Sequence, residues 1–145
     1  AQIISDGVHL NPAIVRYLYN GLGKDRCVCI TDGIQAIGLP DGKYKYYGRE
    51  YIKKEGTARY LDGTLIGTTL DTGTIAFKFQ EFADCSLVEA INTVTKNPSK
   101  VLRISDSKGT ISEGKDADLV LLNEDKSVHA TFVEGALVYN EDEKK

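Results

Sequence analysis

The sequence predicts an α/β fold, and three features of the chain support this prediction. A strand, a helix and a second strand follow one another over residues 2–31, which is the order of a parallel βαβ unit with a right-handed crossover. Short runs separated by glycine over residues 43–61 indicate an antiparallel meander. Helical patterns then occupy residues 65–108, and strand-like runs return over residues 118–139. A barrel segment that carries a small β-domain accounts for this order better than one compact sheet does.

Composition narrows the class of protein. A length of 145 residues, with 41% hydrophobic and 27% charged side chains, is typical of a globular domain with its own core. The net charge of −3 and the scattered basic residues argue against a nucleic-acid partner. The apolar runs are too short to cross a membrane and there is no secretory signal pattern, so we expect no membrane partner. The three cysteines, Cys27, Cys29 and Cys85, favour a reducing cytoplasmic location over a disulfide scaffold.

The first βαβ unit is justified by its local signals. We expect strands over residues 2–5 and 26–31. Asn11 has the character of an N-cap, and Pro12 that of a first helical residue. The helix is expected to end near Gly21. Its inward face is expected to carry three apolar residues, Ile14, Val15 and Leu18.

The middle of the chain combines strands with helices. Three runs, at residues 43–47, 50–54 and 57–61, predict the meander, and residues 65–69 are expected to form a loop that enters a helix. Ile75, Phe79 and Phe82 recur at helical spacing and predict a core-facing stripe. Ser86 and Glu89 form a capping-box pattern that opens a second helix. The inward face of that helix is expected to carry Val88, Ile91 and either Val94 or Thr95.

The last third returns to strands. Asn97-Pro98 predicts the start of a short third helix, and residues 118–122 predict a strand. Glu134-Gly135 between two apolar runs predicts a two-residue hairpin turn. We therefore divide the chain into five segments: a barrel βαβ segment (1–38), a β-meander (39–64), a helical barrel-flanking segment (65–108), the returning strands of a small β-domain (109–140) and a charged tail (141–145).

Both strands of the βαβ unit are followed by ionisable side chains. Asp6 and His9 come after the first strand, and Asp32 comes after the second. Because the carboxyl ends of parallel strands meet at one edge, we expect His9 and Asp32 to lie side by side. An imidazole and a carboxylate there suit proton transfer and carbonyl chemistry. The alternatives are a loop-capping Asp32 and a structural His9. We expect His129, which precedes a hairpin strand and has no carboxylate or Cys partner at metal spacing, to be a surface or β-domain residue.

Six motifs occur in an order that resembles the C-terminal part of the N-acetylglucosamine-6-phosphate deacetylases, in the amidohydrolase superfamily. The resemblance covers nearly the whole chain. The last motif is common among amidohydrolases, whereas the first three together are more specific. The motifs are SDGVH (5–9), ITDG (30–33), GLPDG (38–42), DGTLIG (62–67), NP (97–98) and GTISEGKDADLV (109–120).

The resemblance implies a fold and an activity. The fold is the last strands and helices of a TIM barrel together with the C-terminal contribution to a small β-sandwich. The activity is metal-dependent hydrolysis of the acetamido group of an amino-sugar phosphate, with zinc or iron held by a Glu and two His from earlier strands. The chain has no counterpart of those strands, and it starts without Met in a strand-like run, so we expect a piece of a longer product. Alone it is expected to bind no metal and to lack hydrolase activity, and the open edges of its parallel sheet are expected to drive self-association. For the complete protein we expect a homo-oligomer with an amino-sugar phosphate as substrate.

The resemblance also implies residue roles. Asp32 is the general base and acid. Two stretches contribute to substrate binding, Asp6, Gly7, Val8 and His9 at the first strand tip and Leu65, Ile66 and Gly67 in the predicted loop. The chain departs from the family at Gly33, where Ala is common, and at Thr68 and Thr69, where Ser is usual. The alternatives are another amidohydrolase, acting on a cyclic amide or a related N-acetylhexosamine phosphate, and a non-catalytic sugar-phosphate-binding module.

Overall fold

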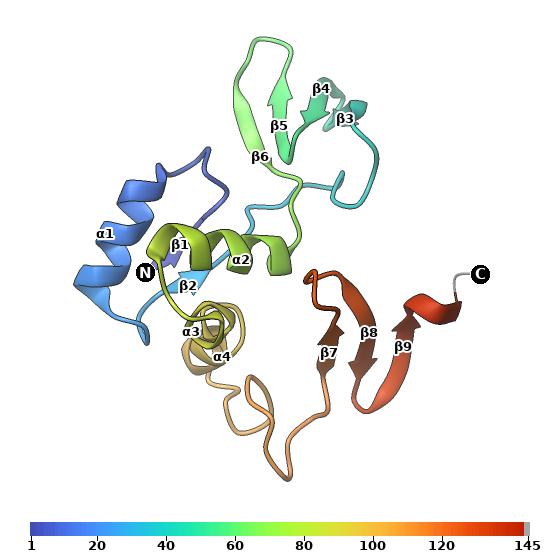
Figure 1. The fold of residues 1–145 in the computed structure, drawn as a ribbon. Helices are drawn as coiled ribbons and strands as arrows, with labels where there is room; N and C mark the ends of the chain where they lie inside the picture. The colour runs from blue at the N-terminus through green and yellow to red at the C-terminus, as the bar shows by residue number, and fades with distance from the viewer. Residues whose placement is uncertain (144–145) are drawn as a thin grey trace. The chain divides into compact units, whose positions relative to one another are not determined.

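The computed structural model describes residues 1–143, which form two compact units, Ala1–Pro98 and a second unit that begins at Ser99 (Figure 1). The first unit begins with the predicted βαβ element. Strands β1 (Gln2–Ile3) and β2 (Val28–Cys29) pair in parallel, with Ile3 opposite Cys29, and helix α1 (Pro12–Leu22) connects them. The prediction of parallel pairing is confirmed, although both strands are shorter than expected.

Helix α1 starts where the sequence predicts and ends later. The Asn11 side chain accepts a hydrogen bond from the Ala13 N–H at 2.9 Å, and Pro12 is the first helical residue. The helix continues to Leu22, and Gly23 rather than Gly21 ends it with a φ of 77°. The inward face was predicted only in part, because Val15 is fully buried while Ile14 is exposed.

The second element of this unit is a four-stranded antiparallel sheet in chain order. It contains β3 (Gly42–Tyr46), β4 (Arg49–Lys54), β5 (Thr57–Tyr60) and β6 (Leu65–Thr68). The predicted meander is confirmed, but the predicted loop over 65–69 is wrong because β6 pairs with β5 as a fourth strand. The alternation of apolar and polar side chains that is typical of a strand is interrupted in β6 by Gly67 and by a register shift opposite Ala58 and Arg59. The strand is therefore recognised only from its pairing with β5.

Helices α2 (Thr72–Ala83) and α3 (Leu87–Asn92) complete the main core. Ile75 and Phe79 are fully buried and Phe82 packs beside them, which confirms the predicted stripe. The Ser86 capping box is also confirmed. Val88, however, is 70% exposed, because Ala90 is the residue of this helix that enters the core. Helix α4 (Lys96–Leu102) follows as predicted and includes the division between the units.

The second unit contains a three-stranded antiparallel sheet of β7 (Leu119–Leu122), β8 (Val128–Val133) and β9 (Ala136–Asn140). Glu134 and Gly135 form the predicted hairpin turn, both with positive φ, as a type I′ turn requires. His129 lies within β8 rather than before it, and its Nδ1 is 3.8 Å from a Glu141 carboxylate oxygen. The predicted tail begins with a 3₁₀ turn (Glu141–Glu143), and its last two residues lie outside the described part.

No helix within residues 1–143 is long and apolar enough to span a bilayer. The cysteines are free thiols. Cys27 and Cys29 are buried in the main core, and burial raises the pKa of Cys29 to about 11. Cys29 is therefore a core residue, as expected, and not a nucleophile at neutral pH.

Candidate functional site

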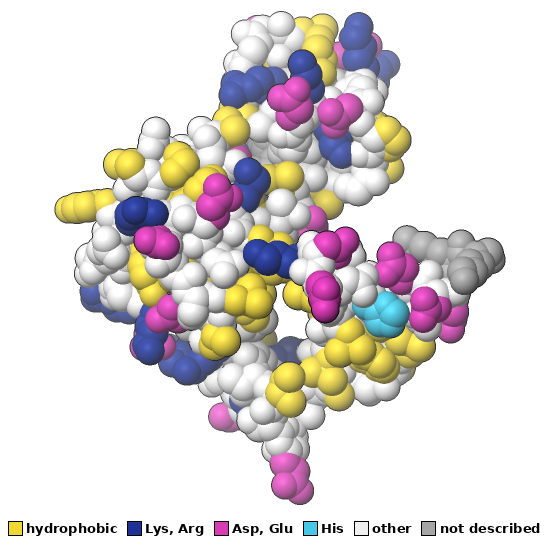
Figure 2. All heavy atoms as spheres, in the orientation of Figure 1, with side chains coloured by type: hydrophobic (Ala, Val, Ile, Leu, Met, Phe, Trp, Pro, Cys, Tyr) yellow, Lys and Arg dark blue, Asp and Glu magenta, His cyan; other side chains and the backbone are white. Residues whose placement is uncertain are grey.

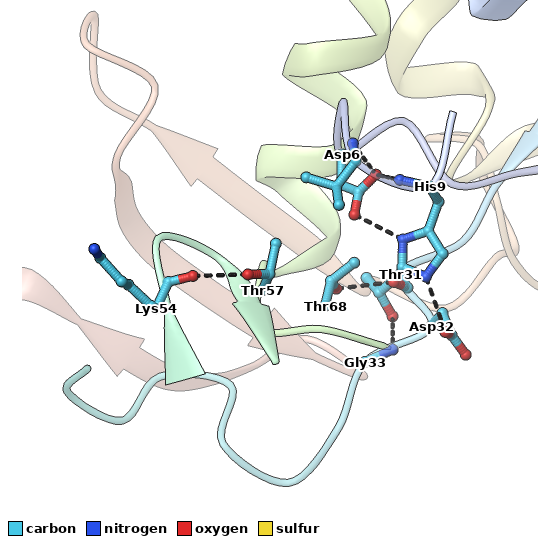
Figure 3. A network of polar contacts seen from close by, with 9 residues as sticks. Asp6, His9, Thr31, Asp32, Gly33, Lys54, Thr57 and Thr68 are labelled. Carbon is cyan, nitrogen blue, oxygen red and sulfur yellow. Dashed lines mark hydrogen bonds and ion pairs between the residues drawn. The ribbon is translucent and has the colours of Figure 1, made fainter. Parts of the chain in front are cut away.

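The tips of β1 and β2 bring the predicted ionisable residues together (Figure 3). The Nδ1 atom of His9 lies 2.7 Å from Oδ2 of Asp6, and the Nε2 atom of the same ring lies 3.4 Å from Oδ2 of Asp32. One imidazole thus lies between two carboxylates. The prediction that His9 and Asp32 lie side by side is confirmed as geometry.

Asp6 is fixed by its own turn. Its side chain is 1% exposed, and its Oδ1 accepts hydrogen bonds from the backbone N–H groups of Val8 at 2.9 Å and His9 at 2.8 Å. Gly7, with a φ of 83°, allows the chain to fold back over the carboxylate. Burial raises the pKa of Asp6, but the hydrogen bonds from the His9 ring and these N–H groups outweigh it. The net pKa lies below the ordinary value, and the carboxylate is charged at neutral pH.

Asp32 presents a more open carboxylate. Its side chain is 54% exposed, and its backbone adopts a positive φ of 49°, which aspartate tolerates better than most residues. The preceding Thr31 hydroxyl accepts a hydrogen bond from the Gly33 N–H at 3.1 Å. Asp32 therefore lies on a tight turn that follows β2, and its carboxylate is accessible to solvent.

Strand β6 holds this turn in place. Its last residue, Thr68, is fully buried and donates from its backbone N–H to the Asp32 carbonyl at 3.0 Å. The Thr68 hydroxyl donates to the Thr31 carbonyl at 2.8 Å, and the Ile34 N–H donates to the Thr68 carbonyl at 3.1 Å. Thr68 thus fixes the backbone on both sides of Asp32.

Gly67 is required by this close approach. A Cβ atom there would lie 2.5 Å from the Asp32 carbonyl oxygen and 3.5 Å from its Oδ2, and the φ of 140° also disfavours any side chain. Gly67 therefore lies next to Asp32, and its role in substrate binding stays a prediction. The other two residues of that stretch are half-buried in β6, where Ile66 packs on Tyr51 and its neighbours and Leu65 pairs with Arg59.

Sequence reasoning missed Thr31 and Thr68 as supports of the site. They are 37 residues apart, and each hydroxyl bonds a backbone group rather than a ligand. Nothing in the spacing of these two residues indicates that they meet.

The open donor atoms are too few for a metal site. Both oxygens of Asp6 and the Nδ1 atom of His9 are already engaged, which leaves His9 Nε2 and the Asp32 carboxylate. A catalytic zinc needs three protein ligands, so these two residues do not fit it by themselves. Within residues 1–143 no group of three or more His, Cys, Asp or Glu side chains could hold an ion.

Comparison with known proteins points to one family. The model of the amidohydrolase family matches residues 4–138. The N-acetylglucosamine-6-phosphate deacetylases of Bacillus subtilis and Homo sapiens are 35% and 32% identical to the chain, over 95% and 97% of its length. The chain spans only 35% and 34% of those two proteins. A putative N-acetylgalactosamine-6-phosphate deacetylase of Escherichia coli K12 is 32% identical over 94% of the chain and 81% of its own length.

Solved structures agree with the sequence matches. The N-acetylglucosamine-6-phosphate deacetylase of Thermotoga maritima superposes with a TM-score of 0.85 and 37% identity, over 97% of this chain and 38% of that one. A mutant of the Mycobacterium smegmatis enzyme, in complex with N-acetyl-D-glucosamine-6-phosphate, superposes with a TM-score of 0.86 and 28% identity, over 96% and 37%. The resemblance expected from the motifs is thereby confirmed, and so is the mixed α/β fold.

Proposed function

The chain belongs to the amidohydrolase family, and from this premise we propose that it is the C-terminal third of an N-acetylglucosamine-6-phosphate deacetylase. The observation that carries the proposal is the 3.4 Å approach of His9 Nε2 to Asp32 Oδ2 at the tips of two parallel strands. Residues 1–38 then form the last βαβ segment of the barrel. The sheet of β7, β8 and β9 is the C-terminal contribution to a small β-sandwich.

Asp32 is the proposed general base and acid. Its exposed carboxylate can accept a proton from the attacking water and return it to the leaving amine of the acetamido group. His9 presents Nε2 toward a substrate oxygen from the opposite side. The backbone at Gly7 and Val8 and along Leu65, Ile66 and Gly67 forms the proposed substrate-binding wall.

We propose that the metal cofactor is bound by residues of the complete enzyme that this chain does not contain. The family implies a divalent ion, zinc or iron, and this chain offers two open donors rather than three. The ligands of such an ion therefore belong to parts of the enzyme outside residues 1–145. We propose a cytoplasmic homo-oligomer as the complete enzyme, with the isolated chain inactive.

The test is acetate release from N-acetylglucosamine-6-phosphate by the complete gene product and by the 145-residue chain. We expect turnover by the first and none by the second. Asp32→Asn in the complete enzyme should lower kcat by about 10²–10⁴-fold with unchanged folding, because it removes the proton acceptor. Asp25→Asn, on an exposed turn, is the matched control. An Asp32→Asn enzyme with full kcat would contradict the proposal.

One observation favours a second substrate. The putative N-acetylgalactosamine-6-phosphate deacetylase of Escherichia coli K12 is matched over most of its length. The two sugar phosphates should therefore be assayed in parallel, and the ratio of their kcat/KM values decides between them. Calorimetry of the isolated chain with either sugar phosphate tests the remaining alternative, a non-catalytic binding module.

A further inference from the structure

We infer that Asp6 is a positioning residue, which holds the proton of His9 on Nδ1 so that Nε2 is the ring atom presented to Asp32 and to the ligand. This inference rests on the proposed function for its catalytic meaning but not for its geometry. It also replaces the expected role of Asp6 in the substrate-binding wall. Gly7, Val8 and His9 keep their proposed roles.

The hydrogen-bond inventory of Asp6 carries the argument. Oδ1 accepts hydrogen bonds from the backbone N–H groups of Val8 and His9, and Oδ2 lies 2.7 Å from His9 Nδ1. With a side chain 1% exposed, the carboxylate has no oxygen open to a substrate. A carboxylate can only accept, so the ring nitrogen that faces it must carry the proton. The neutral ring then has its lone pair on Nε2.

The backbone, and not the ring, determines where the Asp6 carboxylate lies. The two N–H groups come from the same tight turn, in which Gly7 has a φ of 83°. The His9 ring therefore meets an acceptor that is already in place, which is the way an outer carboxylate selects an imidazole tautomer. The second histidine of the chain, His129, differs from His9 in this respect. Its Nδ1 is 3.8 Å from a half-exposed Glu141 carboxylate, which is too far for a hydrogen bond that would select a tautomer.

The consequence concerns the pair of His9 and Asp32. A lone pair on Nε2 and a carboxylate oxygen cannot bond to one another unless a proton lies between them. Nε2 and Asp32 Oδ2, 3.4 Å apart, thus form a site for one shared proton, open on the Asp32 side. In the proposed deacetylase, neutral His9 accepts a hydrogen bond from a substrate hydroxyl, and protonated His9 donates one to a substrate oxygen.

Nitrogen-15 NMR of the histidine rings tests the inference directly. The chain has two histidines, so His129→Gln assigns the signals. In spectra of the neutral rings, His9 should show the Nδ1–H tautomer and His129 the mixture found in solution. In Asp6→Asn the amide oxygen must stay with the two backbone N–H groups. The NH₂ group then faces Nδ1, and the His9 proton should move to Nε2.

The outcomes separate this inference from the proposed function. A wild-type His9 in the Nε2–H form or in the solution mixture overturns the inference, and this reading needs no variant. An unchanged Nδ1–H tautomer in folded Asp6→Asn also overturns it. In the complete enzyme, Asp6→Asn should lower kcat about 10–100-fold. Absence of deacetylation together with the expected tautomers contradicts the proposed function alone.

Discussion

The two units of the chain differ in how much apolar surface they bury. The first contains a core cluster of eight buried residues, in which Ile75 and Phe79 are fully enclosed. In the second, Ala130 is the only buried apolar residue among those described, and hydrophobic side chains lie at the surface over its strands (Figure 2). Every predicted site residue lies in the first unit. A site that needs fixed geometry therefore lies where packing is dense.

The largest effect should come from truncating the main core. Phe79 is fully buried and stacks edge-on with Tyr19, with ring centroids 5.7 Å apart. Phe79→Ala should lower the free energy of unfolding by about 3–5 kcal/mol, because it leaves a cavity. Val138→Ala, at a residue of β9 that is 58% exposed, should cost less than about 1 kcal/mol. Urea unfolding measures both, and equal losses would contradict the contrast between the units.

A smaller effect is expected at the contact between β6 and the Asp32 turn. Gly67→Ala should cost about 1–3 kcal/mol, because the new Cβ meets the Asp32 carbonyl and the φ of 140° is strained. Gly63→Ala is the control, since its φ is also positive but its Cβ would meet nothing within 4 Å. Thermal unfolding gives the cost. The amide shifts of Asp32 and Gly33 should change in the first variant and not in the second.

The smallest effect should come from the cap of α2. Asp71 accepts hydrogen bonds from the Thr74 N–H at 2.9 Å and the Thr74 hydroxyl at 2.7 Å. Burial raises the pKa of Asp71, but these bonds outweigh it and hold the pKa below its ordinary value. The stabilisation by the charge is therefore present above the unfolded-state pKa of about 3.9 and is lost as pH falls through the lower folded-state pKa.

Asp71→Asn isolates this charge, since asparagine also caps helices but does not titrate. The wild type should be more stable than the variant by a few tenths of a kcal/mol near neutral pH, because water screens an exposed cap. The difference should shrink as the pH falls below the unfolded-state pKa of about 3.9, since the Asp71 carboxylate is then progressively protonated and loses its charge. Urea unfolding at both pH values is the measurement. A difference that grows in acid would contradict the assigned direction.

Most of the site was predictable because its parts follow strand ends. His9 and Asp32 could be paired from sequence, since parallel strands place their carboxyl ends at one edge. The role of Asp6 could not, because it depends on how one carboxylate is shared among two N–H groups and a ring. Hydrogen-bond inventories of this kind require atomic positions.

The sequence by itself determined the features whose signals span a few residues. These include the Asn11 cap and the Ser86–Glu89 capping box, which are set by side chains within reach of nearby backbone groups. They also include the Glu134-Gly135 turn, which is set by the positive φ of its two residues. Only the tertiary structure decided that residues 65–68 form a strand and that Thr68 supports the turn at Asp32. Those contacts join segments distant in sequence, and their free energy is gained only when the chain has folded.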